Sequence, residues 1–505
     1  MKGLFGRNRV CGVVAAKTAR EMIGQIRVGL RKTRTLELRL DYLQSSKERV
    51  AFLSWLGRRR LRAVLIATFR RQEGGGLFQG SREEQIALLA QAACAGCDWC
   101  DVEIETAKHM AKGELARALS PARVMVSHHD FRGTPRNLAG IVGRLERAGG
   151  QAIKIAAHCR SVSDSARICE LARRRHNAVA IPMGEFGLAG RVLSLRMGSA
   201  LAYAAVQQAT APGQLSLDTM IDLYRAARIT RHTRLYGVIG DPIGHSLSPL
   251  LHNTAFRARK LDAVFVPFLV RNLREFLAAR KRFGVAGLSV TIPHKESILR
   301  ALDECDPLAA RIGAVNTVVV RGGGRLYGYN TDYVGVLRSL EQRMRLMGSR
   351  VLLFGAGGAA RAAAFALVAA GSIVCICARR PERARALARA AGGQVVLRAD
   401  LKQEFFDAIV NCTPIGMHPH GGSPLASAEL NCRMVMDMVY RPRETELLQL
   451  ARRKHIEVIS GVEMFLAQGF AQYEIWTGQR APESAMRRVV QAVLDREEKS
   501  KGRRS

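Results

Sequence analysis

The sequence predicts an α/β protein in which an N-terminal (β/α)8 barrel precedes a two-part α/β half that contains a Rossmann-type unit. The chain of 505 residues is too long for one ordinary domain. Through about 215 residues, short apolar runs alternate with amphipathic helical stretches, as they do in a barrel. Beyond residue 350, a strand-like run, a glycine turn and a helical stretch follow one another, which is typical of a dinucleotide-binding unit.

Eight strand-like runs define the expected barrel. They are VCGVV at 10–14, LELRL at 36–40, AVLIATF at 63–69, DVEIE at 101–105, RVMVS at 123–127, AIKIAA at 152–157, AVAIP at 178–182 and SALAYA at 199–204. Barrels carry their chemistry at the C-terminal ends of the strands. We expect polar residues at those ends, namely Glu37, Arg39, Arg70, Glu73, His129, Lys154 and Arg191.

The expected domains follow from the change in pattern near residue 230. They are a barrel over 8–225, a short basic linker over 226–234, a small α/β domain over 235–335, a Rossmann domain over 336–470, and C-terminal helices over 471–497 that return to the small domain. We expect the charged tail REEKSKGRRS to be disordered.

The charge balance is strongly basic, with 78 Lys+Arg against 43 Asp+Glu and a net charge of +35. The arginines are scattered through both halves and accompany no zinc finger, helix-turn-helix or RNA-binding aromatic signature. We therefore expect attraction of small anionic substrates rather than a dedicated nucleic-acid partner.

No apolar run is long enough for a membrane span, so we expect no membrane partner. The start, MKGLFGRNR, lacks a secretory apolar stretch, and we expect a cytoplasmic protein.

Cys94, Cys97 and Cys100 have a C-x2-C-x2-C spacing that raises the alternative of an iron–sulfur cluster. The fourth cysteine of a ferredoxin run is missing. We interpret the three as buried structural cysteines and expect no metal site.

Lys154 is the strongest candidate for a catalytic residue, because it lies inside the apolar run AIKIAA. Burial disfavours an ammonium and turns the amine into a nucleophile for a carbonyl. The alternative is a lysine paired with an internal carboxylate. His129 is a plausible proton shuttle. With arginines nearby to bind an anion, the set indicates Schiff-base chemistry on an acidic keto compound.

The first half also resembles type I 3-dehydroquinate dehydratase, through EGG at 73–75, SHHDFRGTP at 127–135, IKIA at 153–156 and TAPGQ at 210–214. The resemblance implies that Lys154 forms the Schiff base with 3-dehydroquinate. It also implies that His129 moves protons and that Glu73 orients it. Glu37, Arg39 and Arg70 would hold hydroxyls, Arg191 the carboxylate, and Thr210 and Gln214 would complete a closing loop. The Arg-to-Glu spacing in FRRQEGG is one residue shorter than in relatives.

In the second half, VLLFGAGGAARAAAFAL at 351–367 contains a G-x-G-x-x-A turn. Its backbone would approach a pyrophosphate at a helix N-terminus. The turn residues are Gly355, Ala356, Gly357, Gly358 and Ala359. The next strand ends in Arg379 and Arg380, with Arg383 a turn later, where an enzyme that uses NAD would carry an acidic residue. We therefore predict NADP(H) as the cofactor; the alternative is a solvated basic loop.

The stretch GHSLSPLLH at 244–252 carries Ser246 and Ser248 between two histidines. A hydrolase elbow needs glycine where Ser248 stands, so a nucleophilic serine is not supported. Pro249 suits the first position of a helix, which makes Ser248 the expected N-cap.

The second half resembles shikimate dehydrogenase. The motifs are GHSLSP, SVTIPHK, GAVNT at 313–317, NTD at 330–332, GAGGAAR, NCTPIGM at 411–417, DMVY at 437–440 and GVEMFLAQG at 461–469. The resemblance implies a catalytic pair, Lys295 and Asp332. It also implies substrate contacts by Ser246, Ser248, Ser289, Thr291, Asn316, Tyr440 and Gln468, and cofactor contacts by Thr413, Met438 and Gly461.

The two resemblances imply a bifunctional enzyme. The barrel would dehydrate 3-dehydroquinate to 3-dehydroshikimate, and the second half would reduce that product to shikimate with NADPH. Alternatives are the same folds with a preference for quinate or NAD, and a basic scaffold whose sites have decayed.

Overall fold

The computed structural model describes residues 4–5, 9–59, 61–111, 113–417 and 420–501. The chain divides into two compact units. The first contains residues 1–235 and 262–285, and the second contains residues 236–261 and 286–505.

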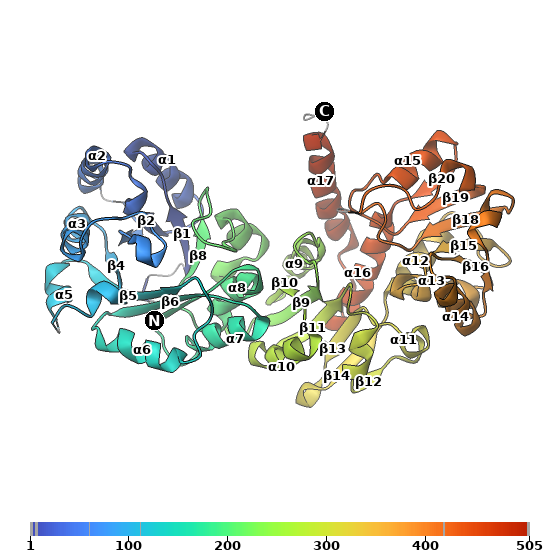
Figure 1. Ribbon diagram of the computed structural model, residues 1–505, viewed down its shortest axis with the longest axis horizontal. Helices are drawn as coiled ribbons and strands as arrows, with labels where there is room; N and C mark the ends of the chain where they lie inside the picture. The colour runs from blue at the N-terminus through green and yellow to red at the C-terminus, as the bar shows by residue number, and fades with distance from the viewer. Residues whose placement is uncertain (1–3, 6–8, 60, 112, 418–419, 502–505) are drawn as a thin grey trace. The chain divides into compact units, whose positions relative to one another are not determined.

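The first unit holds an eight-stranded parallel barrel (Figure 1). Its strands are β1 (Val10–Val14), β2 (Thr35–Arg39), β3 (Val64–Thr68), β4 (Trp99–Glu103), β5 (Arg123–Asp130), β6 (Ala152–His158), β7 (Ala178–Met183) and β8 (Ala202–Ala205). The sheet order runs β7-β6-β5-β4-β3-β2-β1-β8. Between β7 and the segment that leads into β8, the backbone N–H of Ala200 donates to the carbonyl of Ala178 at 2.9 Å, and Ser199 Oγ accepts from the N–H of Ala180 at 3.0 Å. The predicted barrel is confirmed.

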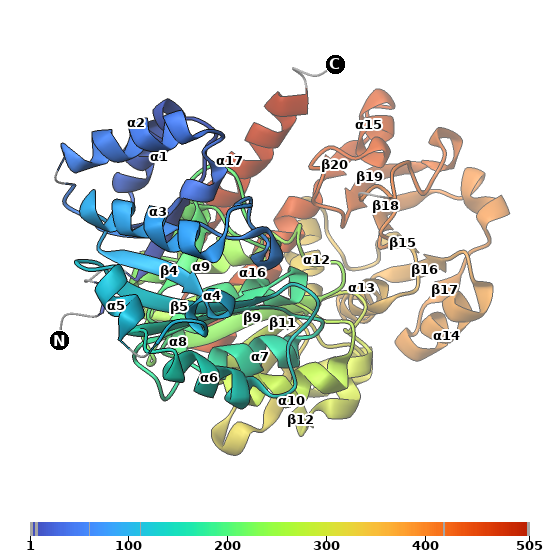
Figure 2. The ribbon, with the colours of Figure 1, turned by 60° about the vertical axis from the view of Figure 1, so that its left-hand side comes forward.

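Helices cover the outside of this barrel (Figure 2). They are α1 (Ala19–Leu30), α2 (Ser46–Gly57), α3 (Arg82–Cys94), α6 (Leu138–Arg147), α7 (Val162–Glu170) and α8 (Leu188–Arg196), with the short α4 (Ile104–Ala107) and α5 (Glu114–Ala118). Local sequence explains their starts. Ser81 and Glu84, for example, form a reciprocal capping box at the start of α3.

The strand expected at 101–105 lies two residues earlier, as β4, and its last two residues belong to the short helix α4. The expected boundary was wrong because Ile104 continues the alternation of apolar and polar residues into a segment that turns away from the sheet.

A second sheet has the order β10-β9-β11-β13-β14-β12. Its strands are β9 (Arg234–Gly240), β10 (Ala263–Leu269), β11 (Val285–Val290), β12 (Glu304–Cys305), β13 (Thr317–Val320) and β14 (Leu326–Tyr329). β13 is antiparallel to both β11 and β14, so the sheet is mixed.

The third sheet is parallel and has the order β17-β16-β15-β18-β19-β20. Its strands are β15 (Arg350–Phe354), β16 (Ile373–Cys377), β17 (Gln394–Val395), β18 (Phe406–Asn411), β19 (Cys432–Asp437) and β20 (Glu457–Ile459). Strand order reverses at β15, which is where open α/β sheets bind ligands. The helices of this region are α12 (Asp332–Glu341), α13 (Gly358–Ala369), α14 (Pro381–Ala391), α15 (Glu446–Arg453) and α16 (Gly461–Thr477).

The last helix, α17 (Glu483–Lys501), packs against α9 (Ser248–Ala258) within the second unit. The expectation of a disordered tail from residue 496 was wrong for 496–501, because these charged residues are good helix formers that continue the amphipathic helix. The rest of the tail lies outside the described residues.

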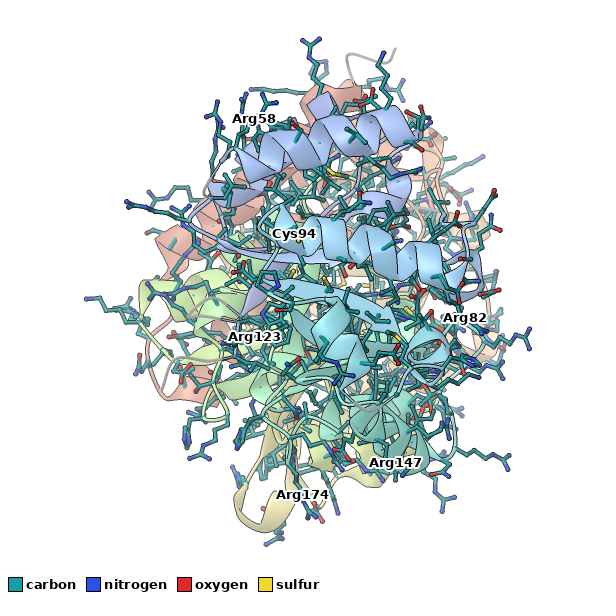
Figure 3. The ribbon with its side chains drawn as sticks, turned by 90° about the vertical axis from the view of Figure 1, so that its left-hand side faces the viewer. Arg58, Arg82, Cys94, Arg123, Arg147 and Arg174 are labelled. Atoms are coloured by element: carbon teal, nitrogen blue, oxygen red, sulfur yellow. The ribbon has the colours of Figure 1, made fainter. Side chains whose placement is uncertain are left out.

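Exposed arginines are spread over the helical exterior of the first unit (Figure 3). Arg58, Arg82, Arg123, Arg147 and Arg174 all point into solvent from different helices, strands and turns. Among the described residues, no helix is long and apolar enough to cross a membrane.

The three clustered cysteines do not share one environment. Cys94 is exposed at the end of α3, whereas Cys97 and Cys100 are buried. The interpretation of all three as buried was therefore wrong for Cys94, which lies on the solvent side of the helix end. No group of three or more His, Cys, Asp or Glu side chains in the described part of the chain is arranged to hold a metal ion.

Candidate functional site

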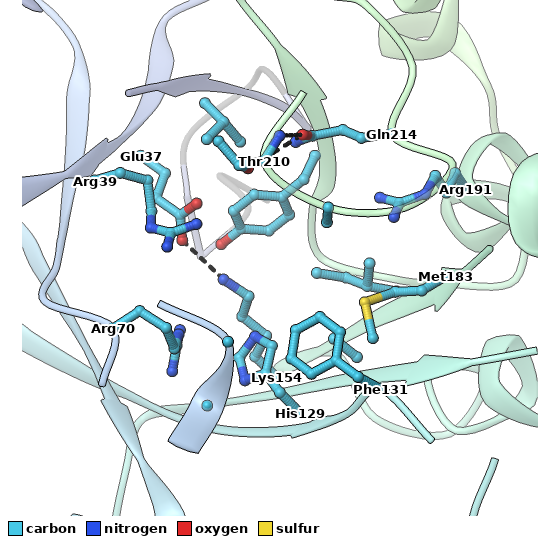
Figure 4. Close-up of a pocket in the computed structure, with 17 residues that line it drawn as sticks. Glu37, Arg39, Arg70, His129, Phe131, Lys154, Met183, Arg191, Thr210 and Gln214 are labelled. Carbon is cyan, nitrogen blue, oxygen red and sulfur yellow. Dashed lines mark hydrogen bonds and ion pairs between the residues drawn. The ribbon is translucent and has the colours of Figure 1, made fainter. Parts of the chain in front are cut away.

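A pocket opens inside the barrel (Figure 4). Eight of the residues expected at this site line it, namely Glu37, Arg39, Arg70, His129, Lys154, Arg191, Thr210 and Gln214. Its apolar lining includes Val13, Phe131, Ile181, Met183 and Tyr203, which sequence reasoning did not single out. Parallel strands deliver these side chains from distant parts of the sequence to one cavity.

Lys154 lies in the middle of β6 and is 4% exposed. Its Nζ donates to Glu37 Oε1 and to Asp101 Oδ2, both at 2.8 Å. The same atom lies 4.2 Å from the centroid of the Tyr203 ring. Lys154 thus forms the internal ion pairs that the sequence raised as an alternative to catalysis. It also lines a pocket, as a catalytic nucleophile must.

Asp101 connects this lysine to a second cation. Its Oδ1 lies 2.9 Å from an Nη atom of Arg70 and accepts from Ser127 Oγ at 2.5 Å. Burial opposes the charge of this carboxylate, but Arg70 and Lys154 together hold the pKa of Asp101 below its usual range. Sequence reasoning missed Asp101, although a carboxylate in a buried strand was a usable signal.

Arg39 is held by a different carboxylate. Its guanidinium donates to both oxygens of Asp41, at 2.9 and 2.8 Å, and both side chains are buried. This bidentate pair fixes the plane of the guanidinium at the pocket wall.

His129 is half-buried at the C-terminal end of β5, with its ring stacked on Phe131. Burial, followed by the charges of Arg70 and Lys154, lowers the pKa of His129 well below its usual value, so the neutral imidazole is favoured. Its Nδ1 has no hydrogen-bond partner among the described residues. A neutral imidazole with an unpartnered Nδ1, in the same pocket as an amine, is suited to accept or pass a proton.

Arg191 was expected at a strand end, but it lies on α8. The helix follows β7 closely enough to bring the guanidinium to the pocket, where an Nη atom donates to the carbonyl of Pro212 at 2.9 Å. Its Nε has no partner among the described residues, and burial lowers the pKa of Arg191 to about 10. A hydrogen bond within the loop that carries Pro212 stabilises it: Gln214 Oε1 accepts from the N–H of Thr210 at 2.7 Å.

Glu73 is not brought to His129. It lies in a 3-10 turn, its side chain is 73% exposed, and its Oε2 lies 3.0 Å from Arg71 Nε. The expectation that Glu73 orients His129 is therefore not met by the geometry. The short spacing in FRRQEGG explains this, because Arg70 turns inward while the following turn directs Glu73 to solvent.

In the second unit, Lys295 Nζ donates to Asp332 Oδ2 at 2.5 Å. Asn316 Nδ2 donates to the other oxygen of that carboxylate at 2.8 Å. Asp332 begins α12, Lys295 follows β11, and Asn316 precedes β13. The Lys–Asp pair predicted from the motifs and the asparagine that supports it thus come from three segments.

Ser246 and Ser248 lie at the start of α9, but Ser248 is the first helical residue and Leu247 the N-cap. The N-cap prediction was therefore wrong. The chain enters the helix one residue earlier, and Ser246 Oγ accepts from the N–H of Ser248 at 3.2 Å. Ser246 also hydrogen-bonds the hydroxyl of Tyr440, whose ring stacks on Phe465 at 4.4 Å.

Ser289 is bound to a residue that sequence reasoning missed. Its Oγ donates to Gln472 Oε1 at 2.7 Å, and Gln472 Nε2 donates to the carbonyl of Asn316 at 3.1 Å. Gln468 Nε2 donates to the carbonyl of Phe465 at 2.8 Å. Thr291 is half-buried, and its N–H donates to the carbonyl of Ile239 at 3.0 Å.

The glycine turn has the geometry of a phosphate-binding turn. Gly355 has φ of +124°, and a Cβ there would lie 3.1 Å from Thr413 Cγ2. Gly357 is the N-cap of α13, and a Cβ there would have nothing within 4 Å, so its backbone faces open space. Ala356 lies within the turn, while Gly358 and Ala359 begin the helix. These residues fit a dinucleotide pyrophosphate.

Arg379, Arg380 and Arg383 are exposed just after β16, the strand that pairs with β15 beside the glycine turn. No carboxylate occupies positions 378–380. This cationic end of the strand fits a 2′-phosphate.

Three further positions border this region. Thr413 Oγ1 donates to Asn411 Oδ1 at 2.7 Å, Met438 follows β19, and Gly461 begins α16. A Cβ at Gly461 would lie 2.6 to 2.7 Å from three backbone carbonyl oxygens, so only glycine fits there.

Family models match three parts of the chain. Type I 3-dehydroquinase matches residues 10–231, the shikimate dehydrogenase substrate binding domain matches 238–318, and the shikimate 5'-dehydrogenase C-terminal domain matches 461–491.

Individual proteins similar to this chain are known. A bifunctional 3-dehydroquinate dehydratase/shikimate dehydrogenase, chloroplastic, from Arabidopsis thaliana is 35% identical over 472 residues, which cover 88% of this chain and 78% of the relative. A shikimate dehydrogenase (NADP(+)) from Methanothermobacter thermautotrophicus is 42% identical over 53% of this chain and 100% of the relative. A solved shikimate 5-dehydrogenase from Thermus thermophilus, in complex with NADP(H) and shikimate, has a TM-score of 0.48 at 35% identity and covers 52% of this chain and 100% of that one. The chain therefore belongs to the family of bifunctional 3-dehydroquinate dehydratase/shikimate dehydrogenases.

Proposed function

We propose that the barrel dehydrates 3-dehydroquinate and that the second half reduces the product, 3-dehydroshikimate, to shikimate with NADPH. The observation that carries this proposal is the buried amine of Lys154 in a pocket lined by arginines and an imidazole, in a chain that also holds a Lys295–Asp332 pair. We retain the domain boundaries expected from the sequence as part of the proposal.

In the barrel, the neutral amine of Lys154 attacks the C3 ketone, and loss of water gives an iminium. The positive nitrogen acidifies the C2 proton, and His129, which lines the same pocket, takes it. The C1 hydroxyl leaves as water with a proton returned by His129. Hydrolysis of the iminium then releases 3-dehydroshikimate and restores the amine, so the net change is loss of one water.

Charged residues around the amine bind the substrate. Arg191 has an unpartnered Nε and no carboxylate partner among the described residues, which supports a role in binding the substrate carboxylate. Glu37, Arg39 and Arg70 line the other side and face the ring hydroxyls. Thr210 and Gln214 close the pocket from their loop.

In the second half, NADPH supplies a hydride to the ketone when it is bound. Lys295 donates a proton to the developing alkoxide, and Asp332 keeps the lysine charged and oriented. Ser246 and Ser248 bind the substrate carboxylate at the start of α9. Tyr440, Asn316, Thr291, Ser289 and Gln468 contact the remainder of the substrate.

The glycine turn from Gly355 to Ala359 would hold the pyrophosphate, and Arg379, Arg380 and Arg383 would hold the 2′-phosphate. Met438 and Gly461 would border the nicotinamide, and Thr413 would contact the cofactor. The guanidinium groups support NADP(H) over NAD, because a 2′-phosphate needs a cation and a free 2′-hydroxyl prefers a carboxylate.

We place this chemistry in the cytoplasm. All eleven cysteines are free, including the exposed Cys94, as is usual in a reducing compartment.

Borohydride trapping tests the barrel chemistry directly. The full-length protein is mixed with 3-dehydroquinate and sodium borohydride, and the adduct is located by peptide mass spectrometry. A reduced adduct on Lys154, absent when 3-dehydroquinate is omitted, supports the imine. Turnover of 3-dehydroquinate without any adduct on Lys154 would contradict it. NADPH oxidation with 3-dehydroshikimate tests the reductase separately.

A further inference from the structure

The amine of Lys154 has two carboxylate partners at equal distance, and only one of them lines the pocket. Glu37 lines the pocket, whereas Asp101 lies behind the lysine and is not part of the lining. The Asp101 side chain is fully buried. The two carboxylates therefore have different surroundings, although both are 2.8 Å from the same nitrogen.

Asp101 is also more firmly held. Its Oδ1 receives the guanidinium of Arg70 at 2.9 Å and the hydroxyl of Ser127 at 2.5 Å. Ser127 in turn accepts from another Nη atom of Arg70 at 2.8 Å. Glu37 has a weaker additional contact, from Thr68 Oγ1 at 3.1 Å. Asp101 thus forms the corner of a closed triangle with Arg70 and Ser127, while Glu37 remains available to the pocket.

This arrangement follows from the strand register. Ser127 on β5 lies next to Lys154 on β6 and next to Glu103 on β4. Asp101 sits two residues before Glu103, so its side chain points to the same face of β4. Within the described residues, Asp101 is the only carboxylate in ion-pair contact with both Lys154 and Arg70.

We propose that Asp101 is the positioning residue of the dehydratase site. It holds Lys154 Nζ toward the pocket and stays paired with that nitrogen both in the resting ammonium and in the iminium, while Glu37 is released to the substrate. This inference rests on the proposed function of the barrel. Because a buried cation needs a counter-ion at each stage, a fixed carboxylate behind the nitrogen keeps one without competing with the substrate.

Removal of this charge has a defined effect on pH dependence. An ammonium with one carboxylate fewer loses its proton at lower pH, so the acid limb of kcat/KM moves to lower pH by about 1–3 units. The titratable and charged groups around the amine are Cys11, Glu37, Arg70, Asp101, His129 and Tyr203. A substitution that only destabilised the barrel would lower kcat/KM at every pH and would not change the pH at which the acid limb of the profile lies.

The decisive experiment compares Asp101→Asn, which keeps the shape and loses the charge, with Asp101→Glu, which keeps the charge. In the full-length protein, Asp101→Asn is expected to lower kcat for dehydration by about tenfold or more and to move the acid limb to lower pH. Asp101→Glu is expected to restore the position of the limb. The rate at which the same samples reduce 3-dehydroshikimate, together with their melting curves, shows how much of each protein is folded.

The outcomes separate the inference from the function on which it rests. If Asp101→Asn matches wild type, or lowers kcat with an unmoved limb, the positioning role is wrong. If wild type itself forms no borohydride adduct on Lys154, the proposed dehydratase chemistry fails instead. If Asp101→Asn does not fold, Ser127→Ala decides the question, because it removes a bond to Asp101 and leaves both charges. It should slow formation of the borohydride-trapped adduct on Lys154 while the melting temperature stays at the wild-type value, a combination that a destabilised barrel would not give. An unchanged rate of adduct formation would overturn the proposal.

Discussion

Lys295 Nζ and Asp332 Oδ2 lie 2.5 Å apart in the second unit, and Asn316 donates to the other oxygen of the same carboxylate at 2.8 Å. The carboxylate is buried, whereas the lysine side chain is 19% exposed. One face of the pair is therefore fixed within the protein, and the cation is left accessible to a substrate.

Lys295→Ala should lower kcat for NADPH-dependent reduction of 3-dehydroshikimate by about 10²–10⁴-fold, since it removes the proton donor to the alkoxide. Dehydration of 3-dehydroquinate by the same protein should be unchanged. Both rates are measured on one preparation by NADPH absorbance and by product formation. A folded Lys295→Ala protein that had lost both activities would be inconsistent with two independent sites.

Lys154→Ala should abolish dehydration and leave reduction intact, because no other amine is available in the described pocket lining to form the imine. Lys154→Arg is the matched control, since it keeps a cation near Glu37 and Asp101 but cannot form an imine. Equal loss in both variants would assign the effect to the nucleophile. Dehydration retained by either variant would disprove covalent catalysis by Lys154.

The double variant Arg379→Ala/Arg380→Ala should raise KM for NADPH and leave KM for NADH nearly constant. A lost charged hydrogen bond costs about 1.5–3 kcal/mol, which corresponds to a roughly 10- to 150-fold change. Arg389→Ala, an exposed arginine near the end of α14, is the control and should have no effect. An equal rise in KM for NADPH and KM for NADH would show that these arginines do not bind the 2′-phosphate.

Glu73→Gln should change dehydration by no more than about fivefold, because an ion pair that is exposed to solvent contributes little. The relevant contact is Glu73 with Arg71, at 3.0 Å. The assay is kcat for dehydration at several pH values. A loss of several hundredfold would mean that Glu73 reaches His129 during turnover, as the sequence comparison alone implies.

His252 provides a test of pH-dependent stability. Burial lowers the pKa of His252 to about 3, and the ring packs against Trp476 at 5.0 Å. The unfolded chain binds a proton near pH 6.5 and the folded chain does not, so stability falls as pH drops from about 6.5 toward 3, by about 1.4 kcal/mol per pH unit. His252→Gln should remove that part of the slope, as measured by denaturant unfolding followed by tryptophan fluorescence. An identical slope in both proteins would contradict the buried neutral state.

The barrel could be predicted because its strands are short apolar runs bounded by amphipathic helices, a pattern that survives small errors such as the two-residue shift of β4. Lys154 could be found for the same reason, as a charge inside such a run. Its partner Asp101 was missed because it is the first residue of the strand expected at 101–105, a position where a charged side chain is usually exposed to solvent.

The remaining differences depend on tertiary structure. Arg191 reaches the pocket from a helix, and no local pattern encodes how closely α8 follows β7. The outward direction of Glu73 depends on a 3-10 turn that is shaped by its contact with Arg71. The role of Gln472 comes from helix α16 packing beside Ser289, and the chain separates these two residues by 183 positions. Sequence patterns report local burial well and such long-range contacts poorly.

The most direct measurement supplies the purified full-length protein with NADPH and 3-dehydroquinate as the sole other substrate. Two working sites in series predict steady oxidation of NADPH after a lag, with shikimate as the product. NADPH that stays reduced with 3-dehydroquinate, while 3-dehydroshikimate supports its oxidation, would contradict the dehydratase activity of the barrel. No oxidation with either substrate would contradict the reductase assignment as well.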